Sequence, residues 1–219
     1  MKLRPVLAEA LGTALLLAAI VGSGIMAERI SGGNVGVALL ANAIATGGAL
    51  FALIVMFGPI SGAHFNPVVT LALTLQRESG AKWLLPFLMA QVAGGIVGVW
   101  LAHLMFDLPI LQASTKVRTG LGQWVAEATA TFGLVLLILL GVRKAAASLP
   151  AAVALYIVGA YWFTASTSFA NPAVTIARSL SNTFAGIAPS DAPAFIAAQL
   201  AGALLAVAMA RLLQTSRAK

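Results

Sequence analysis

The chain has 219 residues, of which 60% are hydrophobic and only 9% are charged, and its formal net charge is +7 at neutral pH. Soluble globular proteins carry about 25% charged residues, so this composition excludes a soluble domain and indicates an integral membrane protein. A net positive charge would suggest nucleic-acid binding only in a soluble protein. Here it bears on how the chain is oriented in the bilayer.

Six apolar segments are long enough to cross a membrane, since a helix needs about 17–25 residues to span a hydrocarbon core of ~30 Å. We expect crossings at Pro5–Ala27, Val35–Phe57, Trp83–Phe106, Trp124–Val142, Leu149–Ala165 and Ala192–Leu213. The first segment contains Glu9 and is longer than a signal-peptide core, so we interpret it as an uncleaved helix. Little sequence lies outside the crossings, which predicts one all-α membrane domain over residues 1–219.

The basic residues are distributed unevenly between the two sides of the predicted membrane domain. The side of the N-terminus carries nine of the 13 Lys and Arg residues, namely Lys2, Arg4, Arg77, Lys82, Arg143, Lys144, Arg211, Arg217 and Lys219. The other side carries Arg29, Lys116, Arg118 and Arg178. Because Lys and Arg are in excess in cytoplasmic segments, both termini are expected in the cytoplasm.

The second half of the chain resembles the first half. LAEALGTALLL, which contains Glu9, matches VAEATATFGLVLL, which contains Glu127, and MAQVAGGIVG matches AAQLAGALLA. Between these pairs, GAHFNPVVTLAL matches SFANPAVTIARSL. The three matches occur in the same order and predict a repeat with halves at about 1–112 and 113–219. With three crossings each, the halves must have opposite orientations, an arrangement that places a shared site near the midplane.

Each half contains an Asn-Pro pair followed by a short apolar run, Pro67–Leu75 and Pro172–Leu180. Asn is a favoured N-cap and Pro is favoured at the first helical position, so Asn66 and Asn171 are predicted to start helices. A helix of about nine residues is ~14 Å long, roughly half the bilayer core, and cannot cross alone. We therefore expect two re-entrant half-helices whose starts meet at the membrane centre.

Two facing half-helix starts predict a site for neutral solutes. A helix N-terminus acts as about +0.5 charge, and two facing ends repel cations, including hydronium. The side-chain oxygens of Asn66 and Asn171 are expected to cap the helices while their NH₂ groups donate to a passing solute. The alternative is that both residues only cap helices. No catalytic constellation and no histidine–carboxylate cluster occurs in the sequence, so we expect no enzyme activity, metal or cofactor.

These features resemble the aquaporin (major intrinsic protein) family over the whole chain, through the six crossings, the paired Glu and Gln residues, SGAHFNP and FANPAV. The resemblance implies the aquaporin fold, a passive channel and a homotetramer with one pore per subunit. It also implies that Glu9 and Glu127 accept hydrogen bonds from the re-entrant loops and that the carbonyl of His64 faces the pore. The first motif departs from the usual Asn-Pro-Ala, because Val68 stands where the second motif has Ala173.

The resemblance also implies a selectivity filter on the outer side of the paired asparagines. Its four positions, counted from the two asparagines, are Thr46, Gly159, Ser168 and Val174. The last position is normally arginine in the family, and its replacement by Val174 predicts a wide, neutral ring. Arg178 lies one helical turn further on and is expected in the outer vestibule. Whether it substitutes for the missing arginine stays open at this point.

Other polar residues in the crossings have less specific expectations. Gln91 and Gln199 are expected to make hydrogen bonds between helices, while support of the re-entrant loops is the alternative. His103 is expected to face lipid or the interface and is assigned no role.

The stretch AYWFTASTSFANPAVTIARSL resembles a bacterial aquaporin subgroup associated with arsenic resistance. This resemblance implies a bacterial inner-membrane channel for arsenite and related metalloid hydroxides, with glycerol and water as further solutes. One alternative is a general glycerol, urea and water facilitator. A second is a proton-coupled transporter that uses Glu9 or Glu127, because transporters also contain inverted repeats. A third is a structural membrane protein with an occluded pore.

Overall fold

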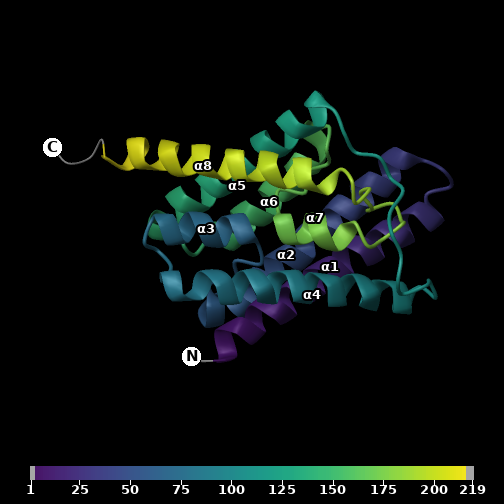
Figure 1. Ribbon diagram of the computed structural model, residues 1–219, viewed down its shortest axis with the longest axis horizontal. Coiled ribbons are helices and arrows are strands. Elements are labelled where there is room, and N and C mark those ends of the chain that lie inside the picture. Colours follow the sequence, from purple (N-terminus) through teal and green to yellow (C-terminus); the bar gives the residue numbers. More distant parts are fainter. Residues whose placement is uncertain (1–2, 216–219) are drawn as a thin grey trace.

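The computed structural model describes residues 3–215, so Lys2, Arg217 and Lys219 of the charge count lie outside the described residues. This part of the chain forms α1 (Leu3–Ile30), α2 (Val35–Ser61), α3 (Pro67–Leu75), a 3₁₀ turn (Ala81–Trp83), α4 (Leu84–Met105), α5 (Leu121–Lys144), α6 (Leu149–Phe163), α7 (Pro172–Arg178) and α8 (Ala192–Thr215). The start of α1 and the end of α8 lie toward the same end of the helical bundle (Figure 1). The long connections 106–120 and 179–191 lie at the opposite end.

Within residues 3–215, five helical segments are long and apolar enough to cross a membrane, namely α1, α2, the 3₁₀ turn with α4, α5 and α8. The helix α6 is shorter, with 15 residues, or ~22 Å at 1.5 Å per residue. It ends at Phe163 because the backbone of Thr164 is extended, whereas the sequence predicted a crossing as far as Ala165. Residues 164–171 then lead back to the start of α7.

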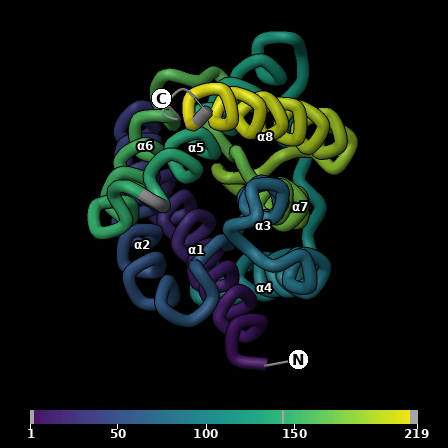
Figure 2. The backbone as a smooth tube through the Cα atoms, turned by 90° about the vertical axis from the view of Figure 1, so that its left-hand side faces the viewer, coloured from purple at the N-terminus to yellow at the C-terminus, as the bar shows by residue number. Residues whose placement is uncertain are grey.

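The two short helices occupy the middle of the molecule. In both views α3 and α7 lie between α4 and α8 (Figures 1 and 2), and they contact both of these helices. They begin close together and run in opposite directions (Figure 1). The helix α3 ends at Leu75, as the sequence predicted, while α7 ends at Arg178, two residues before the predicted Leu180.

Close helix crossings hold this arrangement at matching places in the two halves. A Cβ added to Gly94 of α4 would lie 2.2 Å from the carbonyl oxygen of Ala10 in α1. A Cβ added to Gly202 of α8 would lie 2.3 Å from the carbonyl oxygen of Ala128 in α5. Real Cβ atoms do not come within 3.0 Å of such neighbours, so both crossings need glycine, as is common between membrane helices.

Buried apolar clusters surround the half-helices. Val68, the residue that departs from the Asn-Pro-Ala pattern, is 1% exposed and belongs to a cluster with Val135 of α5 and with Ala203 and Val207 of α8. Its extra bulk therefore fills the core between α3 and the second half of the chain. This packing fixes the position of the first half-helix from the side opposite to α4.

We predict that Gly94→Ala lowers the free energy of unfolding by about 1–3 kcal/mol, the usual cost of overpacking. The reason is that the new methyl group would clash with backbone atoms of Ala10 in α1. Backbone atoms cannot rotate out of the way as a side chain can. Gly48→Ala is the matched control, because an added Cβ there has no neighbour within 4 Å. Thermal unfolding of both variants in detergent gives the comparison, and equal midpoints would contradict this account of the crossing.

Candidate functional site

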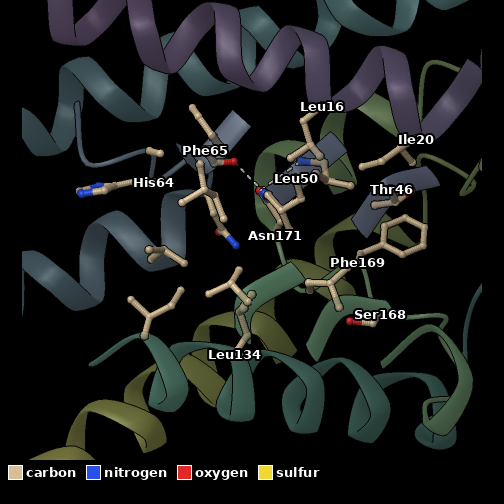
Figure 3. Close-up of a pocket in the computed structure, with 18 of the residues that line it drawn as sticks. Leu16, Ile20, Thr46, Leu50, His64, Phe65, Leu134, Ser168, Phe169 and Asn171 are labelled. Atoms are coloured by element: carbon tan, nitrogen blue, oxygen red, sulfur yellow. Dashed lines mark hydrogen bonds between the residues drawn. The ribbon is translucent and has the colours of Figure 1, made fainter. Parts of the chain in front are cut away.

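A cavity extends along the middle of the molecule, past both half-helix starts (Figure 3). His64 lies at one end, Thr46 and Ser168 lie at the other, and Asn171 lies between them. We call these the His64 end and the Thr46 end. The cavity volume is about 130 Å³, counted as the space open to the centres of water-sized molecules. One water needs roughly 10–15 Å³ of such space, so the cavity has room for several waters. Its walls are mostly aliphatic side chains of α1, α2, α5 and α6, including Leu16, Ile20, Leu50, Ile54, Leu134, Ile138 and Ile157.

The two re-entrant loops have left-handed backbone at matching positions. Ala63 and Phe65 have φ values of 51° and 50°, and Ser168 and Ala170 have φ values of 51° and 48°. Such conformations cost residues other than glycine about 1–3 kcal/mol each and persist only where the surroundings hold them. Successive turns of this kind can direct neighbouring N–H groups into one concave site. In both loops that site is filled by a buried carboxylate.

Glu9 of α1 holds the first loop and is fully buried. Its Oε1 accepts a hydrogen bond from the backbone N–H of His64 at 2.9 Å, and its Oε2 accepts one from Phe65 at 2.7 Å. The amide Nε2 of Gln91 donates to the same Oε2 at 2.7 Å and to Thr70 Oγ1 of α3 at 3.0 Å. Gln91 therefore ties α4 to both the carboxylate and the half-helix.

Glu127 of α5 holds the second loop in the same way. Its Oε1 accepts from the backbone N–H of Phe169 at 2.8 Å, and its Oε2 accepts from Ala170 at 2.9 Å. Gln199 Nε2 donates to Glu127 Oε2 at 2.6 Å and to Thr175 Oγ1 of α7 at 2.9 Å. Each carboxylate thus satisfies backbone N–H groups that have no water to bind at this depth.

The two asparagines lie at the centre of the cavity, where the half-helices α3 and α7 begin. Each caps its own half-helix and also binds the opposite re-entrant loop; we call this contact between the two halves the central junction. Each Oδ1 accepts a hydrogen bond from the backbone N–H two residues on, at 3.1 Å for Asn66 and 2.9 Å for Asn171. Asn66 Nδ2 donates to the carbonyl oxygen of Ala170, and Asn171 Nδ2 donates to that of Phe65, both at 2.8 Å (Figure 3 shows the second bond). A side-chain amide has two N–H donors, so one donor of each asparagine remains for the cavity.

The structure brings three of the four expected filter residues to the Thr46 end, but not Gly159. Thr46, Ser168 and Val174 line the cavity there, together with Tyr161, whose hydroxyl lies 3.3 Å from Thr46 Oγ1. Residues four apart share a helix face, and α6 turns Ile157 and Tyr161 to the cavity. Gly159 lies two residues from each, on the exposed face, so its expected place in the filter is wrong. Because α6 is apolar on all sides, its pattern does not indicate which face lines the cavity, and no signal in the sequence identified Tyr161.

The polar groups at the Thr46 end are mainly hydroxyls. Ser168 is 3% exposed, and its Oγ has no hydrogen-bond partner in the described part of the chain. Val174 is 2% exposed and contributes an apolar surface to the same cavity. A ring of this kind both donates and accepts hydrogen bonds and carries no fixed charge.

Arg178 lies closer to the pathway than expected. The sequence placed it in the outer vestibule, whereas the structure places it in the wall of the cavity together with Val174, four residues earlier on α7. Arg178 is 2% exposed. Its Nε donates to the carbonyl oxygen of Ala185, and its guanidinium carbon lies 3.4 Å from the centre of the Phe169 ring.

Two more cations lie at the Thr46 end, outside the residues that line the cavity. Arg118 Nε donates to the carbonyl oxygen of Gly186 at 2.8 Å, and Lys116 Nζ donates to that of Phe184 at 2.7 Å. Burial, together with the nearby charges of Arg118 and Arg178, lowers the pKa of Lys116 to about 8. Part of the positive charge that Lys116, Arg118 and Arg178 place at this end is therefore lost above pH 8.

His103 is buried and does not face lipid, which corrects the expectation from the sequence. Its ring nitrogens lie 3.0 Å from the carbonyl oxygen of Ile110 and 2.9 Å from Ser181 Oγ. It thereby joins α4 to the connections 106–120 and 179–191. Within residues 3–215 there is no group of three or more His, Cys, Asp or Glu residues that could hold a metal ion.

Known proteins resemble this chain in sequence and in fold. Residues 1–162 match the family model of the major intrinsic proteins. The chain is 55% identical over 215 residues to Aquaglyceroporin AqpS of Rhizobium meliloti (strain 1021), covering 98% of this chain and 92% of that protein. It is 33% identical over 150 residues to Aquaporin-8 of Rattus norvegicus, covering 64% of this chain and 54% of that protein.

The fold resembles the X-ray structure of the aquaglyceroporin from Plasmodium falciparum, with a TM-score of 0.70 over 94% of this chain and 93% of that chain. The two sequences are 20% identical, so this likeness concerns the fold alone. It confirms the fold class predicted from the sequence, an all-α membrane protein with two half-helices.

We predict that Glu127→Gln lowers stability more than Glu28→Gln does. Glutamine would present one NH₂ group to N–H donors that now bind a carboxylate, and a hydrogen bond to a charged group contributes about 1.5–3 kcal/mol. Glu28 is exposed and serves as the control. Thermal unfolding and folded yield after size-exclusion chromatography measure the effect. If both variants unfolded at the same temperature, Glu127 would not be the support of the second loop.

Proposed function

The chain belongs to the major intrinsic protein family, whose members are membrane channels for water and small solutes and not enzymes, and from this premise we propose that its pathway also conducts arsenite and related metalloid hydroxides. The observation that carries the proposal is the ring at the Thr46 end. Thr46, Tyr161 and Ser168 supply three hydroxyls around the apolar Val174. Neutral solutes with several hydroxyls, such as arsenite and glycerol, match this pattern of donors and acceptors.

The centre of the cavity supports passage of uncharged solutes. A solute oxygen there can accept hydrogen bonds from the remaining N–H donors of Asn66 and Asn171. The starts of α3 and α7 direct their positive ends to the same place, which opposes cations. Water that is oriented by donors at both half-helix starts cannot form a continuous chain for proton transfer. Selection for neutral solutes thus follows from the junction, independently of the ring.

The ring supports passage of solutes larger than water, with one correction to the sequence-based view. Valine at position 174 leaves space that an arginine would fill. Tyr161 takes the place that was expected for Gly159, so the ring is narrower and more polar than a glycine would make it. We therefore propose Thr46, Tyr161, Ser168 and Val174 as the filter.

A general facilitator for glycerol, urea and water is the second candidate, and the name of the relative Aquaglyceroporin AqpS favours it. The relative rates of arsenite and glycerol transport separate it from the first proposal. A proton-coupled transporter receives no support from the carboxylates. Both Glu9 and Glu127 are buried, and their oxygens are engaged by several donors of the re-entrant loops and the glutamines. Uptake that collapses with the proton gradient would contradict this view.

The setting of the channel is part of the proposal. We propose a homotetramer with one pore per subunit in the inner membrane of a bacterium. Both termini would be cytoplasmic and the Thr46 end would face outward. The excess of Lys and Arg on the side of the termini supports this orientation, and the bacterial relative supports the membrane.

The test is a solute panel in liposomes, with water, glycerol, urea and arsenite, for the wild type and Val174→Arg. Arginine adds bulk and a permanent charge with five donors. We expect the flux of arsenite and glycerol to fall about tenfold or more, which corresponds to a barrier higher by about 1.4 kcal/mol, while water flux falls less. Val174→Met has a similar length without charge and separates size from charge.

Two results would count against the filter and the substrate. If glycerol flux in Val174→Arg equals that of the wild type at matched protein content, Val174 does not lie at the constriction. If arsenite enters wild-type liposomes no faster than empty ones while glycerol does, the general facilitator is the correct function.

A separate prediction concerns the central junction. Asn171→Asp keeps the capping oxygen but removes the amide donors and adds a negative charge, so we expect lower flux of neutral solutes and a measurable cation leak. Asn182→Asp adds the same charge in an exposed connection and is the control. Stopped-flow light scattering and ion-flux measurements on the same liposomes give both quantities. Unchanged flux without leak would show that Asn171 only caps α7.

A further inference from the structure

Arg178 is the single permanently charged residue among those that line the cavity within residues 3–215. A charged side chain buried among membrane helices is costly and usually marks a functional site. Arg178 is 2% exposed, so its charge is almost fully removed from bulk water. It belongs to α7, one turn beyond Val174, and shares the cavity face with it.

The contacts of Arg178 hold its guanidinium in one place without neutralising it. Nε donates to the carbonyl oxygen of Ala185, and the guanidinium lies against the ring of Phe169. That ring is fixed on two sides, since the backbone N–H of Phe169 binds Glu127 at 2.8 Å and the ring packs edge-on against Phe195. Among the described side chains, no carboxylate pairs with Arg178 and no further hydrogen bond uses its terminal amino groups.

The neighbouring cations have different surroundings. Arg118 also lies near the Phe169 ring, at 5.1 Å, but its guanidinium donates to the carbonyl oxygens of Gly186 and Ser166 at 2.8 Å and 3.1 Å. It is not among the residues that line the cavity, and neither is Lys116. The unpaired charge that faces the pathway therefore comes from Arg178.

We propose that Arg178 is the charge filter of this channel and that it acts one helical turn away from the ring that selects solutes by size. A fixed cation repels a second cation strongly where little water screens it. The guanidinium lies against the aromatic ring of Phe169, one helical turn from Val174. The channel thereby excludes cations at the Thr46 end without narrowing its ring. This inference rests on the proposed function, because it assumes that solutes pass through the cavity.

The test compares urea with guanidinium, which have nearly the same planar shape and differ in charge. Liposomes contain the wild type, Arg178→Met, Arg178→Lys or the control Lys116→Met, which removes a cation at the same end but outside the cavity wall. We expect the wild type to conduct urea and exclude guanidinium. In Arg178→Met we expect guanidinium flux to rise about tenfold or more, the order expected for losing a like charge at low screening. Arg178→Lys and Lys116→Met should stay close to the wild type.

A double variant distinguishes charge from local structure. In Val174→Arg/Arg178→Met a cation returns to the pathway one turn further in, and we expect the ratio of guanidinium to urea flux to return to the wild-type value. Val174→Met/Arg178→Met adds similar bulk without charge and should keep the raised ratio. If Arg178 only anchored the connection 179–191 through Ala185, both double variants would keep the raised ratio of Arg178→Met.

The outcomes separate this inference from the proposed function. A wild type that does not conduct urea, glycerol or water would overturn the proposed function. A wild type that conducts urea, with guanidinium excluded equally by Arg178→Met, would overturn the role of Arg178 alone. If Arg178→Met does not fold, Arg178→Gln replaces it. A wild type that conducts guanidinium as fast as urea overturns the role of Arg178 without any variant.

Discussion

The structure depends on how backbone N–H groups are satisfied inside a membrane. Two loops leave the helical pattern at the centre of the molecule, where the bilayer offers no water to bind them. Glu9 and Glu127 solve this problem with one carboxylate for each loop. Each carboxylate accepts two consecutive backbone N–H groups and a glutamine amide. A negative charge is tolerated in an apolar helix because these donors surround it.

The support of the loops determines the geometry of the pathway. Left-handed residues in both loops turn the chain back toward the centre, where the half-helices α3 and α7 begin. Once the loops are fixed, the amides of Asn66 and Asn171 reach across to the opposite loop and lock the two halves together. Gly94 and Gly202 allow α4 and α8 to lie close enough for their glutamines to reach the carboxylates. The carboxylates that hold the loops, the asparagine contacts between the halves and the close helix crossings at glycine therefore depend on one another.

At the Thr46 end, two properties that one arginine could provide together come from different residues. In the filter that we propose, hydroxyls and Val174 set the width and polarity of the ring, while Arg178 places a cation one helical turn away. Phe169 connects the second loop with Arg178. Its backbone N–H is held by Glu127, and the face of its aromatic side chain binds the guanidinium. A change in size selection at Val174 can thus occur without a loss of charge selection, which fits a channel for bulky neutral hydroxides.

The sequence by itself determined the membrane class, the long apolar helices and the two half-helices, because length, apolar composition and the Asn-Pro signals act locally along the chain. It also identified Glu9, Glu127, Asn66 and Asn171, which are conspicuous as polar residues in apolar surroundings. Only the tertiary structure decided which side of each helix faces the cavity. A membrane helix is apolar both toward lipid and toward its neighbours, so its pattern does not reveal its buried face. For this reason the sequence alone favours Gly159 where α6 presents Tyr161 and predicts that His103 faces lipid or the interface. The place of the Arg178 guanidinium follows only from its contacts with Phe169 and Ala185.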